Sequence, residues 1–315
     1  MEELIRIERR GRILIARIHN PPHQLMNGAM TAELGALVRR ADTDPDVGVV
    51  IFTGSDPERF IAHYDVGELL DGARQSPSLS AAGAKAAVSL VGGLRRLPGV
   101  DWLLSKSPAN GILQLQDFHE TLSLMGRSGA IFIAAINGQT AGGGMELSLA
   151  CDLRYISDRG QMGQLEVLLG FPPGGGGTQR LARFIGGAKA LELLLSGRAL
   201  DAREAERLGV VHAVFPHDRV LDEVIQSAEP LSRRFKPAVA AIKRAIHEGG
   251  SLPLDEGLLV EHAQFMAMMG TEAAQRAMQA YQQRFEEIGT VPAYDSASRR
   301  QLDDGELVDF NASRS

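Results

Sequence analysis

Two runs of six residues, 47–52 and 131–136, contain only apolar residues and glycine. Each run is short for a helix and rich in valine or isoleucine, which is typical of a strand buried on both faces. A strand of this kind needs other elements packed on both sides of its sheet. The two runs therefore predict a layered fold around a buried sheet.

The residues before the first run predict a strand pair and a helix. Residues 4–7 and 13–18 are two runs rich in isoleucine and leucine that flank a turn at Gly11, which predicts a β-hairpin. Apolar residues then recur at the spacing of one helix face, up to a helix end near Asp44, and these are Met30, Leu34, Leu37 and Val38. A hairpin, a helix and a buried strand in this order predict ββα or βαβ repeats and an α/β fold.

The rest of the chain divides by pattern. Residues 71–128 mix small residues with alanine-rich stretches and predict an insertion of two or three helices. After Gly186 the pattern is almost wholly helical, whereas residues 291–315 are polar, have no periodicity and are expected to be loose or dependent on a partner. We therefore expect an α/β core over 1–200, a helical region over 201–290 and a polar tail.

Glycine accounts for 35 of the 315 residues, and two blocks, 142–144 and 174–177, each precede an expected helix. The blocks are either tight turns or places where backbone N–H groups approach a ligand. Neither contains the lysine of a phosphate-binding P-loop or the spacing of a dinucleotide fingerprint, so we exclude both kinds of phosphate loop. Stabilisation of a carbonyl oxygen that gains negative charge remains open.

Charge and cysteine content limit the partners. With 33 Lys and Arg against 39 Asp and Glu, the net charge of −6 disfavours a nucleic-acid partner. The single cysteine, Cys151, lies in an apolar run and is expected to be a buried thiol in a reducing compartment. We expect a cytoplasmic protein without a membrane span, because no apolar stretch is long enough and the first residues do not resemble a targeting peptide. The histidines lack the spacing of a metal site.

Two glutamates stand in apolar surroundings next to the glycine blocks. Glu146 follows Gly144 inside the run Met145–Ala150, and Glu166 lies between Leu165 and Val167. A buried carboxyl group is costly unless it is paired or its ionisation is shifted. Each glutamate alone reads as a surface acid, but together they suggest an acid/base pair.

Long stretches of the sequence resemble the enoyl-CoA hydratase/isomerase (crotonase) superfamily. The resemblance covers residues 3–288 apart from the insertion. Its central motifs are IAAING at 133–138, AGGGMEL at 141–147, CD at 151–152, GQLEVLLG at 163–170, PGGGGTQRL at 173–181 and LDAREAERLGVV at 200–211. Upstream it includes Asn27, DPDV at 44–47, TG at 53–54 and FIAHYDV at 60–66.

The resemblance implies a spiral of ββα repeats, followed by a helical region through which subunits form a homotrimer or homohexamer. It implies an acyl-CoA thioester as substrate and no metal or redox cofactor, since coenzyme A belongs to the substrate. The glycine blocks are then expected to bring backbone N–H groups up to the thioester.

The resemblance also assigns roles to residues. The backbone N–H groups of Tyr64 and Gly143 would form an oxyanion hole for the thioester carbonyl. Glu146 would orient the attacking water and accept its proton, and Glu166 would deliver a proton to the α-carbon. Because both glutamates are present, the expected reaction is the addition of water across the 2,3-double bond of an enoyl-CoA.

The CoA moiety is assigned by the same resemblance to Ala62, His63, Asp65 and Val66. His63 and Tyr64 stand where the family has small residues and glycine, so the backbone at His63 must not need a positive φ. Both side chains could narrow the acyl pocket or add a polar group to it.

Two alternative functions stay open. One is another acyl-CoA reaction on the same scaffold, namely double-bond isomerisation, decarboxylation, or thioester or C–C hydrolysis. All of these share the enolate-stabilising hole, so the glycines cannot separate them. The other is a non-catalytic CoA-binding scaffold, which the intact glutamate pair disfavours.

Overall fold

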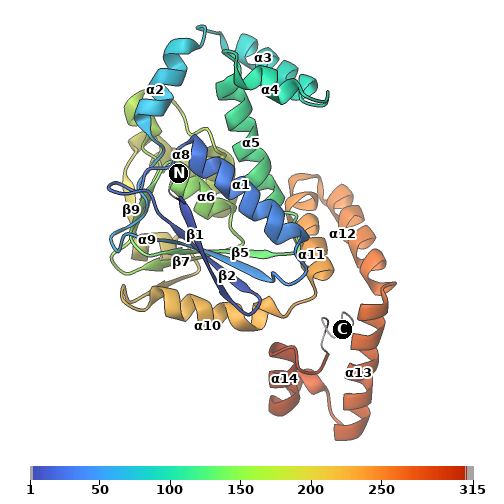
Figure 1. Cartoon of the computed structure of the whole chain (residues 1–315). Coiled ribbons are helices and arrows are strands. Elements are labelled where there is room, and N and C mark those ends of the chain that lie inside the picture. Colours follow the sequence, from blue (N-terminus) through green and yellow to red (C-terminus); the bar gives the residue numbers. More distant parts are fainter. Residues whose placement is uncertain (1–2, 309, 311–315) are drawn as a thin grey trace.

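The computed structural model of the chain describes residues 3–308 and 310. Two sheets form its centre (Figure 1). The larger sheet has the strand order β1 (Ile5–Arg10), β2 (Ile13–Ile18), β3 (Val49–Gly54), β5 (Ile131–Ile136), β7 (Leu153–Ser157) and β10 (Ala213–Phe215). The smaller sheet has the order β4 (Arg59–Ile61), β6 (Gln139–Ala141), β8 (Gln161–Gly163) and β9 (Ala199–Asp201). The predicted hairpin is β1 and β2, which pair antiparallel.

Helices occupy most of the remaining chain. Those before the middle of the sequence are α1 (Gly28–Thr43), α2 (Val66–Gln75), α3 (Ala81–Leu94), α4 (Val100–Ser105), α5 (Asn110–Met125) and α6 (Gly143–Ala150). Those after it are α7 (Gly177–Ile185), α8 (Gly187–Ser196), α9 (Ala202–Arg207), α10 (Val220–Ser232), α11 (Lys236–His247), α12 (Leu254–Met269), α13 (Glu272–Ile288) and α14 (Ser296–Asp303). Short 3₁₀ turns are η1 (Glu166–Leu169), η2 (Gly249–Ser251) and η3 (Pro292–Tyr294).

The order of elements confirms the predicted ββα repeat. β3, β4 and α2 form one unit, β5, β6 and α6 the next, and β7 and β8 with η1 and α7 a third. The first strand of each unit joins the larger sheet and the second joins the smaller one, in both cases parallel to its counterpart. The chain thus winds as a spiral in which corresponding strand ends lie side by side.

The two apolar runs are the central strands, as predicted. Every residue of β3 and of β5 is buried. Alternate residues face two different clusters, so that Phe52 and Phe132 stack at 6.2 Å in the larger cluster, while Ile51 and Ile133 pack against Val224 of α10. A sheet covered on both faces explains why these strands lack the polar alternation of a half-exposed strand.

The insertion is helical and only partly peripheral. α3, α4 and α5 lie within 71–128, and α2 reaches into it. α5 buries Leu113, Phe118, Leu122 and Met125, so it belongs to the core. α3 and α4 lie at the outer end of the molecule in Figure 1 and bury only Val91.

The polar tail, expected to be loose or dependent on a partner, contains the 3₁₀ turn η3 and the helix α14 within residues 291–308. α14 forms there because the side chain of Asp295 accepts from the N–H of Ser298 at 2.8 Å. Arg284 of α13 then donates to the Ser298 hydroxyl at 2.9 Å. This cap, together with hydrogen bonds from α13 and from the end of α10, holds a helix that periodicity does not reveal. The last residues of the tail lie outside the described part of the chain.

A buried ion pair fastens α11 to the core. Lys243 Nζ lies 2.6 Å from Asp152 Oδ2 and also donates to the carbonyls of Met125 and Ala130 at 3.0 and 2.5 Å. Asp152 accepts in addition from the N–H of Phe132 at 2.7 Å. The pair therefore joins α11, the start of β7, the strand β5 and the end of α5.

We expect Lys243→Met to lower the free energy of unfolding by about 3–5 kcal/mol, because it leaves the Asp152 carboxylate buried without its cation. Urea unfolding followed by circular dichroism measures this loss. The double variant Lys243→Met/Asp152→Asn should recover part of the stability, and Lys189→Met at the exposed surface of α8 should change it little. A double variant no more stable than Lys243→Met would contradict this account.

Candidate active site

Three strands of the smaller sheet deliver the predicted site residues to one place. β4, β6 and β8 are parallel neighbours, so their carboxyl ends meet at one edge of the sheet. Tyr64 follows β4, Gly143 follows β6 and Glu166 follows β8. Residues that are distant in the sequence thereby line one cavity of about 380 Å³.

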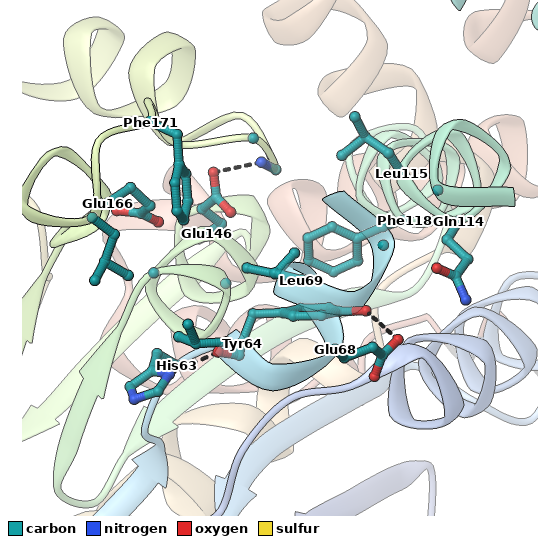
Figure 2. A pocket seen from close by; sticks show the side chains of 18 of the residues that line it. His63, Tyr64, Glu68, Leu69, Gln114, Leu115, Phe118, Glu146, Glu166 and Phe171 are labelled. Carbon is teal, nitrogen blue, oxygen red and sulfur yellow. Dashed lines mark hydrogen bonds between the residues drawn. The ribbon is translucent and has the colours of Figure 1, made fainter. Parts of the chain in front are cut away.

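Figure 2 shows this cavity with Glu146 and Glu166 on one side and Glu68 and Gln114 on the other. Apolar side chains from three elements form the wall between these groups, and they include Leu69, Leu115, Phe118 and Phe171. No lysine or arginine of the described chain is among the lining residues. The cavity therefore combines an apolar middle with carboxyl groups at both ends.

The backbone N–H groups of Tyr64 and Gly143 are close together and unused. Met26 forms a parallel bridge with Tyr64, in which the N–H of Met26 donates to the carbonyl of His63 and the N–H of Asp65 donates to the carbonyl of Met26. Neither the N–H of Tyr64 nor that of Gly143 has an acceptor in the described chain. A Cβ built on Gly143 would lie 3.8 Å from Cβ of Tyr64. Gly143 is also the first residue of α6, where the helix dipole favours negative charge. Two such donors can bind a carbonyl oxygen that becomes anionic.

Glu146 is buried in α6 and its carboxylate is held by the second glycine block. Its Oε1 accepts from the N–H of Gly175 at 2.6 Å and from the N–H of Gly177 at 2.9 Å. Burial raises the pKa of Glu146, and these two N–H groups oppose the rise. Oε2 receives no hydrogen bond from the described residues, so it can face a substrate or a water.

Glu166 is the first residue of η1 and lies beside the loop that carries Gly143. A Cβ built on Gly142 would lie 3.1 Å from Glu166 Oε1. Burial, followed by the nearby charge of Glu146, raises the pKa of Glu166 to about 7. The buried Gln164 amide, turned with its NH₂ group toward the carboxyl group, donates to the two oxygens at 2.8 and 3.0 Å. A carboxyl group with this pKa holds a proton near neutral pH and can give it up.

The expectation that both glycine blocks face the thioester is wrong for the second block. The N–H groups of Gly175 and Gly177 bind Glu146, because this buried carboxylate would otherwise lack donors. A side chain at Gly175 would overlap Glu146 and Phe118, and Gly176 has φ 102°, so glycine is required at both positions. The glycines thus let a loop close tightly over an acid.

The residues assigned to CoA separate into two pairs. His63 and Val66 line the cavity, and His63 Nδ1 is 2.7 Å from the carbonyl oxygen of Tyr64. Ala62 and Asp65 do not line it. Ala62 donates its N–H to Gln24, and Asp65 caps α2 by accepting from the N–H of Gly67 at 2.8 Å. Their role in binding CoA stays a prediction.

The backbone accommodates the side chains at 63 and 64. In the described chain the only residue other than glycine with a positive φ is Gln24, so His63 needs no left-handed conformation. The site also contains residues that sequence patterns did not single out, namely Glu68 on α2 and Gln114, Leu115 and Phe118 on α5. In the sequence, a polar residue on such a helix looks like any residue at the surface, so nothing marks Glu68 or Gln114 as part of a site.

Other sequence predictions can be compared with the structure. Cys151 is buried, as predicted, and burial raises the pKa of its thiol, which disfavours a nucleophilic role. Among the described residues, no group of three or more His, Cys, Asp or Glu side chains is arranged to hold a metal ion. None of the helices described here combines the length and apolar character required to cross a bilayer.

Comparison with known proteins gives one consistent family. Residues 105–287 match the family model described as enoyl-CoA hydratase/isomerase. A probable enoyl-CoA hydratase from Mycobacterium tuberculosis is 33% identical over 280 residues, which are 89% of this chain and 95% of the relative. The 2,3-dehydroadipyl-CoA hydratase of Escherichia coli is 30% identical over 285 residues, covering 90% of this chain and 97% of that protein.

Solved structures agree with the sequence comparison. The crystal structure of an enoyl-CoA hydratase from Geobacillus kaustophilus superposes with a TM-score of 0.74 at 28% identity. The match covers 90% of this chain and 95% of that one. The predicted fold, a spiral of ββα repeats with a helical C-terminal region, is therefore confirmed.

Proposed function

Because the chain belongs to the enoyl-CoA hydratase/isomerase (crotonase) family, we propose that it adds water across the 2,3-double bond of an enoyl-CoA thioester. The observation that carries this proposal is the pair of glutamates in one cavity with two unused backbone N–H groups. The N–H groups of Tyr64 and Gly143 bind the thioester oxygen, and Glu146 and Glu166 flank the double bond.

The proposed reaction follows from the environments of the two acids. Glu146, held through Oε1, orients a water with Oε2 and takes its proton as the water oxygen bonds to C3. The electron pair of the double bond moves onto the thioester, whose oxygen is stabilised by the two N–H groups. Glu166 then gives its proton to C2, and the cycle closes when the proton on Glu146 is returned to Glu166. These groups act without a metal or redox cofactor.

We further propose a homotrimer or homohexamer. The support is an exposed set of large apolar side chains on the C-terminal helices α11 and α12, which would be covered in an assembly. These are Ile242, Ile246, Leu259, Phe265 and Met266, each at least 59% exposed in the single chain. A cytoplasmic location stays a prediction from the sequence.

The proposal predicts that purified protein removes the conjugated-thioester absorbance of trans-2-hexenoyl-CoA. Mass spectrometry should find a product heavier by one water, and reaction in H₂¹⁸O should place the label on C3. Conversion to a 3-enoyl-CoA or release of free CoA would instead identify an isomerase or a thioester hydrolase, and loss of CO₂ from malonyl-CoA, tested separately, would identify a decarboxylase. Binding of the thioester without any turnover would identify a non-catalytic scaffold.

A further inference from the structure

The end of the cavity away from the glutamate pair is polar. The hydroxyl of Tyr64 donates to Glu68 Oε1 at 3.0 Å, and both Glu68 oxygens accept from the N–H of Gly28 at 3.1 Å. Gln114 lies beside them, since a Cβ built on Gly28 would be 2.8 Å from Glu68 Oε1 and 3.0 Å from Gln114 Nε2. Figure 2 shows these three side chains grouped across the cavity from Glu146 and Glu166.

Two members of this polar group, Gln114 and Tyr64, can still form hydrogen bonds with a ligand. The half-buried Gln114 amide makes no side-chain hydrogen bond to another residue of the described chain, although it lines the cavity. Burial and the charge of Glu68 raise the pKa of the Tyr64 hydroxyl, so it keeps its proton and donates it to Glu68. The lone pairs of the phenol oxygen stay available as acceptors. The cavity end thus offers a donor on Gln114 and an acceptor on Tyr64, which together match a hydroxyl group.

Charge restricts what can bind there. Three carboxyl groups, on Glu68, Glu146 and Glu166, line the cavity, and no lysine or arginine of the described chain does. A terminal carboxylate on the acyl chain would lie next to Glu68 without a cation to compensate it. The cavity therefore disfavours the kind of acid-ended acyl group named for the Escherichia coli relative.

Tyr64 also indicates the length of the acyl chain. Its N–H marks the position of the thioester oxygen and its hydroxyl marks the polar end of the cavity. The path from its Cα to its hydroxyl crosses as many bonds as the path from C1 of a hexenoyl chain to a hydroxyl on its last carbon. Leu69 and Phe118 cover the apolar stretch between the two ends.

We propose that Tyr64, Glu68 and Gln114 select 2-enoyl-CoA substrates of medium length whose acyl chain ends in an uncharged hydroxyl group. This inference rests on the proposed hydratase function. Gln114 and the Tyr64 hydroxyl contact the substrate hydroxyl, and Glu68 fixes the direction of the Tyr64 hydroxyl. The three residues thereby determine specificity for the far end of the acyl chain.

The experiment compares three thioesters of equal chain length, which are trans-2-hexenoyl-CoA, 6-hydroxy-trans-2-hexenoyl-CoA and 2,3-dehydroadipyl-CoA. We expect kcat/KM for the hydroxylated substrate to exceed that for hexenoyl-CoA by about tenfold, the size expected for one or two hydrogen bonds. The acid-ended substrate should be the poorest of the three. No hydration of any of them would remove the proposed function itself.

Variants separate specificity from folding. Tyr64→Phe keeps the backbone N–H and Gln114→Leu keeps the volume of the side chain, and each should reduce the preference for the hydroxylated substrate by about fivefold. The matched control is Gln116→Leu on the same helix, because Gln116 donates to Val88 at 2.9 Å and does not line the cavity. It should leave the ratio of the two kcat/KM values unchanged.

Two results would overturn the inference while the hydratase function stands. One is hydration of hexenoyl-CoA with equal or lower kcat/KM for the hydroxylated substrate. The other is an unaltered preference in both Tyr64→Phe and Gln114→Leu, which would reduce these side chains to structural roles.

Discussion

Replacing Glu146 by glutamine is expected to lower kcat for enoyl-CoA hydration by roughly 10²–10⁴-fold. The amide oxygen can still accept from the N–H groups of Gly175 and Gly177, so the loop and α6 keep their arrangement. The NH₂ group that replaces Oε2 cannot take a proton from water. The loss is therefore chemical, and steady-state kinetics with trans-2-hexenoyl-CoA measures it.

Two controls make this result specific. CoA binding by calorimetry and the thermal unfolding temperature should stay close to those of the unmodified protein. Glu120→Gln, at an exposed position of α5, should leave kcat unchanged. Full activity in Glu146→Gln would remove Glu146 as the base, whereas a large loss of CoA binding would assign it a structural role.

Replacing Glu166 by glutamine is expected to cause a loss of similar size and to change the pH profile. Since burial raises the pKa of Glu166 to about 7, its protonated form persists to neutral pH and is lost above it. An enzyme that needs this proton has a kcat/KM that falls as pH rises through about 7. In Glu166→Gln that decline should disappear from the residual activity.

A second readout distinguishes the two glutamates. Delivery of a proton to C2 is the reverse of removing one, so exchange of the α-protons of hexanoyl-CoA in D₂O reports on Glu166 without any addition of water. We expect Glu166→Gln to lose this exchange more completely than Glu146→Gln. Two results would count against the assigned roles. One is a fall of kcat/KM above pH 7 that persists in Glu166→Gln, and the other is an equal rate of α-proton exchange in both variants.

Much of the fold is predictable because its signals are local. The six-residue apolar runs define strands buried on both faces, and the apolar spacing from Met30 to Val38 defines α1. The helix in the tail cannot be predicted from periodicity, because α14 depends on contacts with α13 and with the end of α10.

The site is predictable as a set of residues but not as a set of contacts. Glu146, Glu166, Gly143 and Tyr64 do meet in one cavity. The sequence does not reveal that the second glycine block serves Glu146, since the block and the acid are about thirty residues apart and the loop connecting them sets their distance. Gln114 cannot be recognised from the sequence either, because its neighbours resemble those of any residue on an amphipathic helix.

The parallel arrangement of β4, β6 and β8 has an evolutionary consequence. In the proposed reaction each repeat contributes one separable part of the chemistry, with a backbone donor after β4, a donor and a base after β6, and an acid after β8. A substitution in one loop can therefore replace one chemical group while the sheets and the other two loops stay as they are. Tyr64 illustrates this freedom, since in the proposed reaction its backbone N–H binds the thioester oxygen and its side chain is free to contact another part of the substrate. Such an architecture lets new substrates arise by changes at single strand ends, without any change of fold.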